Sequence, residues 1–164
     1  MSGAEAGAAS RKEAGRGSRR RARELALHAL YQWLLAGHDA DQLCRDAAAA
    51  RDFPRPDRPY LEVLIRGTIE RAAELDAALQ PFLDRPSTAL SPVEHALLLI
   101  GAFELIAVVD VPYRVAINEA VELAKVYGGT DGHKYVNGVL DKLAAQVRPG
   151  ESRPGAARTG GRDG

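Results

Sequence analysis

The sequence predicts an all-α protein, folded as an antiparallel bundle of about six or seven helices with short loops. Three observations predict this fold class. Apolar residues recur at three- and four-residue steps from about residue 19 to residue 148, which is the period of an amphipathic helix. The alternation of Val, Ile and Thr that is typical of strands does not occur. Nor does a repeat of about 20–50 residues, which would indicate a solenoid or propeller.

The first half of the bundle is expected to hold four helical segments. The first covers residues 19–36, and a short second helix covers residues 41–51. Asp57 is placed to cap a third helix, because its carboxylate can accept hydrogen bonds from free N–H groups. Residues 75–83 continue as a helical piece that is bent or broken near Pro81, since proline cannot donate the helical hydrogen bond.

The second half begins with the clearest helix-start signal in the chain. In Ser91-Pro92-Val93-Glu94, serine is the N-cap, proline occupies a position whose N–H is not needed, and glutamate completes a capping box. The helix that follows is apolar nearly all round and therefore belongs in the centre of the bundle. Two further helices are expected, one from Pro112 to Gly128 and one over residues 132–147. Gly138 is expected to permit close helix packing.

Charge is balanced over the chain but unevenly distributed. The 164 residues hold 22 basic and 22 acidic side chains. Residues 11–23 carry seven basic side chains and one acidic, a local charge of +6, whereas residues 24–147 carry 11 basic and 18 acidic, a charge of −7. A basic segment on an acidic body suits the binding of a polyanion at one place. Composition alone leaves open that this segment is a solvated tail.

We expect one helical domain over residues 19–148. Residues 1–18, which have no hydrophobic period, are expected to form a disordered basic arm, and residues 149–164 a disordered tail. No signal peptide is evident at the start of the chain, and the longest apolar stretch, residues 96–109, is too short to span a bilayer. The single Cys44 excludes an internal disulfide and suits a reducing compartment. A cytoplasmic protein without a membrane partner is expected.

The residue types that commonly carry catalysis or bind metals do not form a recognisable site. No two of the four histidines have the spacing of four that holds a metal on one helix face, and Cys44 has no nearby thiol. No glycine-rich phosphate loop follows a strand, and no serine lies in a nucleophile elbow. We therefore expect neither an enzyme nor a metal or cofactor site.

Two segments of the chain resemble a specific family. The first is Arg19-Arg20-Arg21-Ala22-Arg23-Glu24, followed by Ala29-Leu30-Tyr31-Gln32-Trp33. The second runs from Asp110 to Lys125 and includes Ala-Ile-Asn-Glu-Ala; it is followed by Val-Asn-Gly-Val-Leu-Asp-Lys, which ends at Lys142. In this order, the segments resemble the bacterial NusB family over roughly residues 19–149.

The resemblance implies a function. Proteins of the NusB family are all-helical and pair with NusE, which is also a protein of the small ribosomal subunit. The pair binds the single-stranded boxA element of nascent RNA. With other Nus factors on RNA polymerase, it suppresses premature termination, notably in ribosomal RNA operons. The resemblance therefore implies a transcription antitermination factor.

The first candidate RNA contacts are arginines. Single-stranded RNA exposes phosphates and unstacked bases, so a binder needs cations and flat groups. Planar, permanently charged groups stand at the expected start of the first helix, on Arg19, Arg20, Arg21 and Arg23. Cations at a helix N-terminus oppose its macrodipole, and a bound phosphate would reverse that cost. The alternative is a frayed, solvated helix start.

The resemblance also places Lys134 and Tyr135 on the RNA side. Tyr135 could stack on a base and Lys134 could reach a phosphate; the alternative is a core tyrosine and an ordinary surface lysine. Asp131 is expected first to cap the last helix with its carboxylate. The resemblance places its loop beside the RNA, which implies a second role in accepting hydrogen bonds from base edges. For the protein partner, the resemblance points to Tyr31, whose hydroxyl needs a wet or partner-facing edge, and to Glu94, which also serves the capping box.

Two rival functions are compatible with the sequence. One is a general helical RNA-binding or ribosome-assembly adaptor without a role in transcription. The other is a protein-binding module whose basic arm only solvates it. A homodimer is also compatible, because a groove shaped for a partner can be covered by a second copy.

Overall fold

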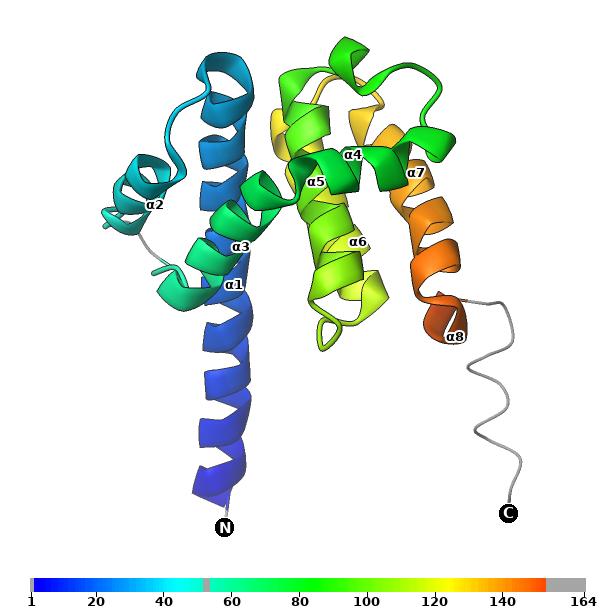
Figure 1. Cartoon of the computed structure of the whole chain (residues 1–164). Helices are drawn as coiled ribbons and strands as arrows, with labels where there is room; N and C mark the ends of the chain where they lie inside the picture. Colours follow the sequence, from blue (N-terminus) through cyan, green and yellow to red (C-terminus); the bar gives the residue numbers. More distant parts are fainter. Residues whose placement is uncertain (1, 52–53, 153–164) are drawn as a thin grey trace, which may run out of the picture. The chain divides into compact units, whose positions relative to one another are not determined.

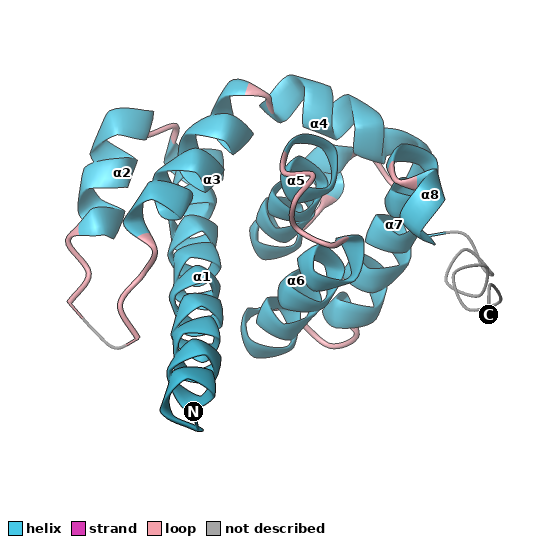
Figure 2. Ribbon diagram, turned by 90° about the horizontal axis from the view of Figure 1, so that it is seen from below, coloured by secondary structure: helices cyan, strands magenta, loops and turns pink. Residues whose placement is uncertain are grey.

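The computed structural model describes residues 2–51 and 54–152, and the regular structure in these ranges is helical throughout (Figures 1 and 2). The predicted all-α class is confirmed. The chain forms two compact units, one ending at Glu70 and the other beginning at Arg71. The division falls at a break in the helix, because Arg71 has φ −105° and ψ 13°. Within the described ranges there are eight α-helices, more than the predicted six or seven.

The first unit consists of α1 (Ser2–Ala36), α2 (Ala40–Ala48) and α3 (Arg58–Glu70). Helix α1 packs against α3, and α2 contacts both. Asp57 caps α3 as predicted, because its Oδ1 accepts a hydrogen bond from the Tyr60 N–H at 3.1 Å. The apolar residues at helical spacing form the core: Ala22, Ala26, Leu27, Leu30, Leu43, Leu61, Leu64 and Ile65.

Helix α1 is longer than the sequence suggested. It begins at Ser2, which corrects the boundary expected near Arg19 and replaces the irregular arm expected over residues 1–18 with helix from residue 2 onward. Alanine, glutamate and arginine are favourable helix formers, and they outweigh the glycines of this segment. The absence of a hydrophobic period therefore did not predict the secondary structure of residues 2–18.

The second unit consists of α4 (Ala72–Leu79), α5 (Pro92–Ala107), α6 (Tyr113–Tyr127), α7 (Gly132–Val147) and α8 (Pro149–Ser152). Short 3₁₀ turns at Gln80–Phe82 and Ser87–Ala89 join α4 to α5, so the predicted break near Pro81 is confirmed. Helix α5 contacts α4, α6 and α7, and all its residues from Ala96 to Leu105 are buried. The central position predicted for this apolar helix is confirmed.

The predicted N-cap of α5 at Ser91 is also confirmed, but the Glu94 carboxylate accepts from the Ser91 hydroxyl rather than from the Ser91 N–H that a capping box uses. Ser91 Oγ accepts a hydrogen bond from the Glu94 N–H at 3.2 Å and donates to Glu94 Oε2 at 2.8 Å. At the other end of the unit, the tail expected from Pro149 begins instead as helix α8. Residues 153–164, the rest of that expected tail, lie outside the described residues.

Close packing of α5 on α7 depends on Gly101. A Cβ added there would lie 2.6 Å from Leu140 Cδ1, whereas a Cβ on Gly138 would meet nothing within 4 Å. The expectation for Gly138 is wrong because this residue does not face the packed side of α7.

Candidate nucleic-acid interface

The four candidate arginines of the first unit lie well inside α1. The expected opposition between these cations and the helix dipole is therefore wrong, because the dipole acts within the first turn of a helix and α1 starts at Ser2. Their positions are set by the packing of α1 against α3.

Arg19 and Arg23, one turn apart on α1, share one aromatic ring of α3. Their guanidinium carbons lie 4.3 and 5.5 Å from the centroid of the Tyr60 ring, within the range of cation–π attraction. Asp57 contributes at the start of α3, since its Oδ2 lies 3.7 Å from Arg19 Nε. The Asp57 N–H also donates to the Ser18 carbonyl at 3.0 Å, which ties the start of α3 to α1. Sequence reasoning missed Tyr60, because no spacing along the chain links it to α1.

The arginines differ in what they present to a ligand. Arg23 is only 4% exposed, so its guanidinium serves mainly the packing of α1 on α3. Arg21 forms an ion pair with Glu24 one turn later, and its side chain is 17% exposed. By contrast, the Arg19 side chain is 40% exposed and Arg20 is an exposed residue. Of these four arginines, Arg19 and Arg20 are the most accessible to a phosphate that approaches the helix.

The start of α7 carries a second cluster, in the second unit. The Tyr135 O–H donates to Asp84 Oδ1 at 3.0 Å. Asp84 also forms an ion pair with Arg85, at 2.6 Å between Oδ1 and Nε, and the Arg85 guanidinium carbon lies 5.3 Å from the Tyr135 ring centroid. The Lys134 side chain is 72% exposed, and its Nζ lies 3.2 Å from Asp131 Oδ1. Tyr135 is half-buried, with its hydroxyl at an exposed loop rather than in the core.

Hydrogen bonds and burial set the protonation states of Asp84 and Tyr135 in this cluster. The hydrogen bonds that Arg85 donates, together with the one from Tyr135, lower the pKa of Asp84 to about 2. The Asp84 carboxylate is therefore ionised at neutral pH. Partial burial raises the pKa of Tyr135, so the phenol stays protonated and remains a donor.

Asp131 precedes α7 but does not cap it with its carboxylate, which corrects the expectation. The residue has φ 63°, in the left-handed region, and no side-chain hydrogen bond reaches the helix N–H groups. A capping residue ordinarily has extended backbone angles that bring its side chain to those groups, and Asp131 pairs with Lys134 instead. Another carboxylate lies at this helix start: a Cβ on Gly132 would be 2.7 Å from Glu94 Oε1. The helix dipole favours an anion at that place.

The two residues assigned to a protein partner belong to different units. Tyr31, on α1, is 39% exposed, and Leu35, one turn later, is 59% exposed. These exposures agree with a wet or partner-facing edge rather than a core position. Glu94, on α5, is half-buried and bonded to Ser91, which leaves part of its carboxylate for other contacts.

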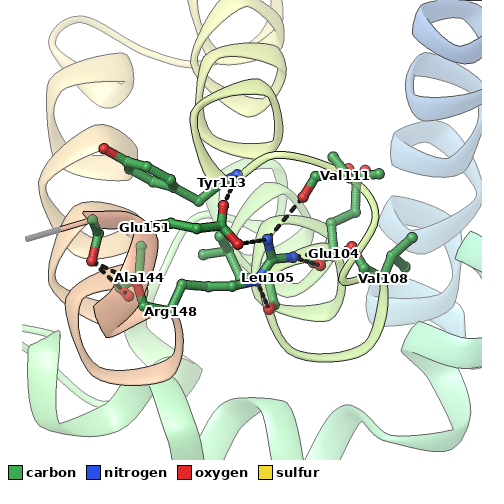
Figure 3. Close-up of polar contacts among 9 residues, drawn as sticks. Glu104, Leu105, Val108, Val111, Tyr113, Ala144, Arg148 and Glu151 are labelled. Atoms are coloured by element: carbon green, nitrogen blue, oxygen red, sulfur yellow. Dashed lines mark hydrogen bonds and ion pairs between the residues drawn. The ribbon is translucent and has the colours of Figure 1, made fainter. Parts of the chain in front are cut away.

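Arg148, the C-cap of α7, carries an extensive polar network that sequence reasoning missed (Figure 3). Its Nη1 donates to Glu151 Oε1 at 3.0 Å, and Glu151 Oε2 accepts from the Tyr113 N–H at 3.3 Å. The remaining guanidinium N–H groups donate at 2.8–3.1 Å to the backbone oxygens of Glu104, Leu105, Val108 and Val111. All five N–H groups are thereby used, which joins the end of α5, the start of α6 and α8. The only sequence signal was a cation near a helix C-terminus, which is common.

The described ranges hold neither a metal-binding cluster nor a membrane-spanning helix. No group of three or more His, Cys, Asp or Glu residues there could hold a metal ion. No helix within those ranges has the length and apolar character needed to cross a membrane.

Comparison of the chain with known proteins gives consistent matches. The model of the NusB family matches residues 20–145. The transcription antitermination protein NusB of Ralstonia nicotianae is 57% identical over 131 residues, which cover 80% of this chain and 84% of that protein. The protein of the same name from Methylobacillus flagellatus is 55% identical over 143 residues, covering 87% of this chain and 92% of that protein.

Solved structures give the same family. A structure of T. maritima NusB aligns with a TM-score of 0.72 at 30% sequence identity, covering 82% of this chain and 95% of that chain. A crystal structure of the antitermination factors NusB and NusE in complex with dsRNA aligns with a TM-score of 0.72 at 26% identity, covering 79% of this chain and 97% of that one.

Proposed function

Because this chain belongs to the NusB family, we propose that it is a transcription antitermination protein that binds RNA together with NusE. The proposal extends to the single-stranded boxA element as the RNA, to other Nus factors and RNA polymerase as further members of the complex, and to the cytoplasm as the place of action. It gives the protein a binding role rather than a catalytic one.

The observation that carries the proposal is a guanidinium held over a tyrosine ring in each unit. Arg19 lies over Tyr60 in the first unit, and Arg85 over Tyr135 in the second. In the first unit Tyr60 is buried, so the partly exposed Arg19 offers a cation for a phosphate. In the second unit the half-buried Tyr135 and the exposed Arg85 together suit a ligand with phosphates and flat bases. An exposed lysine, Lys134, adds a further cation next to Tyr135.

The first test is a titration of labelled boxA RNA with the full chain, with and without NusE. We expect saturable binding that NusE strengthens and that a scrambled RNA of equal length does not reproduce. Equal affinity for boxA and scrambled RNA would favour the general RNA-binding adaptor. The similar crystal structure of NusB and NusE contains dsRNA, so the titration includes a duplex of the same sequence. A preference for the duplex would contradict the assignment of single-stranded RNA.

The second test is the double variant Arg19→Ala, Arg20→Ala. If both side chains contact phosphates, the slope of log affinity against log salt should fall by about 1.4, at about 0.7 per phosphate on a single strand. Arg45→Ala, on α2 of the same unit, is the control, because this arginine is also exposed. An unchanged affinity and slope in the double variant would mean that the basic segment only solvates the protein. Arg23→Ala is expected to lower thermal stability as well as RNA binding, since Arg23 is buried.

The third test concerns NusE. Tyr31→Ala is expected to weaken NusE binding with little change in the melting temperature, because the side chain is 39% exposed and loses few internal contacts. Calorimetric titration and thermal unfolding of the same preparation measure both. A large loss of stability with normal NusE binding would show that Tyr31 is a core residue.

A further inference from the structure

The loop between the two 3₁₀ turns of the second unit holds an arginine that is not among the candidate RNA contacts predicted from the sequence. Arg85 lies between Gln80–Phe82 and Ser87–Ala89. The loop backbone is held by its own hydrogen bonds: the Leu83 N–H donates to the Gln80 carbonyl at 3.2 Å, and Gln80 Nε2 donates to the Arg85 carbonyl at 3.3 Å. Hydrogen bonds within the loop therefore help to keep Arg85 over the Tyr135 ring of α7.

The Arg85 guanidinium is only partly used within the protein. Its Nε and Nη2 donate to the two carboxylate oxygens of Asp84, at 2.6 and 3.0 Å. The guanidinium carbon lies 5.3 Å from the Tyr135 ring centroid, and the side chain is 47% exposed. A guanidinium has five N–H donors, so three are left for a ligand. The planar group can accept a base on its outer face or a phosphate at its edge.

Asp84 reduces the attraction of the Arg85 guanidinium for a phosphate. Its carboxylate is 60% exposed, so a phosphate approaching Arg85 meets a negative charge at close range. The carboxylate also accepts from the Tyr135 O–H, which fixes the ring beneath the guanidinium. Asp84 thus orients the binding group and competes with the ligand for it.

We propose that Arg85, held over the Tyr135 ring, is a further RNA contact, and that Asp84 competes with RNA phosphate for this guanidinium. The inference rests on the proposed function and deepens it. Single-stranded RNA is the ligand that the cluster fits, because the ring, the planar cation and the exposed Lys134 offer stacking and charge together, whereas a carboxylate ligand would need only the charge.

The test is RNA titration over a range of salt concentrations with single and double variants of the full chain. Arg85→Ala should bind boxA RNA about tenfold more weakly, in keeping with the loss of one charge-assisted contact. Its salt slope should be smaller by about 0.7. Arg85→Lys should keep the slope but lose part of the affinity, because an ammonium is not a flat stacking group. Arg114→Ala is the matched control, since Arg114 also lies over a tyrosine ring, 5.4 Å from the Tyr113 centroid.

The effect of Asp84 is read from a double-mutant cycle. Asp84→Asn should tighten RNA binding about threefold or more, and this gain should largely disappear in the Arg85→Ala background. An equal gain in both backgrounds would overturn the competition, since it would reflect only the general charge of the surface. Unchanged or tighter binding by Arg85→Ala would overturn the contact.

The inference and the function on which it rests fail in different ways. If the native chain binds no RNA with or without NusE, the proposed function fails. If Arg19→Ala, Arg20→Ala weakens binding but Arg85→Ala does not, only the assignment of Arg85 fails. Circular dichroism of each variant establishes that the helices are intact, and all three arginines are partly or fully exposed, so folded variants are expected.

Discussion

Replacing Arg148 with methionine should destabilise the second unit strongly. Methionine keeps much of the apolar stem but removes all five guanidinium donors. Four backbone carbonyls, those of Glu104, Leu105, Val108 and Val111, would lose their bonds to this side chain, and Glu151 would lose its cation. The Arg148 side chain is only 6% exposed, so water can replace these bonds only if the loop opens.

The magnitude follows from the number of bonds. At about 1 kcal/mol net for each hydrogen bond, the four carbonyl bonds alone amount to about 4 kcal/mol. Breaking a buried charged network by removing one partner costs about 3–5 kcal/mol, which is the same range. For a chain of this size, about 2–4 °C of melting temperature is lost per kcal/mol, so a decrease of roughly 10 °C is expected.

Thermal unfolding by calorimetry at pH 7 measures this decrease. Lys142→Met is the matched control, because it removes one positive charge from an exposed position of the same helix, α7. Arg148→Lys should lie between the two, since an ammonium has three donors in place of five. If Arg148→Met melts within error of Lys142→Met, the network contributes no net stability and the reasoning is refuted.

Two further outcomes are expected in the same unit. Gly101→Ala should cost about 1–3 kcal/mol by overpacking, because its Cβ would lie 2.6 Å from Leu140 Cδ1, whereas Gly138→Ala should stabilise by up to about 1 kcal/mol through helix propensity. Denaturant unfolding of the two variants checks the contrast, and equal effects would contradict it. The pKa of Glu151 is lowered, first by the hydrogen bond from the Tyr113 N–H, so its stabilising contribution is present above the ordinary value of 4.5 and is lost as pH falls through the lower folded value. Glu151→Gln should therefore reduce the loss of stability in acid, and an unaltered profile of stability against pH would exclude this contribution.

Local sequence signals were sufficient for most of the helices. The Ser91 cap, the break at Pro81 and the bounds of α7 were all predictable, because each depends on residues within about four positions of one another along the chain. The start of α1 was not, because an apolar period reports burial rather than helix propensity, and residues 2–18 form helix without that period.

The family was likewise accessible from the residues, since it rests on residue types in a fixed order. Which cations are exposed was decided only by the tertiary structure. Arg19 and Arg23 belong to one basic run, yet packing against Tyr60 buries one and leaves the other partly exposed. The pairing of Asp84 and Arg85 with Tyr135 and the Arg148 network join segments that are distant in the sequence. Such contacts depend on how the helices pack, and no periodicity within a single helix encodes them.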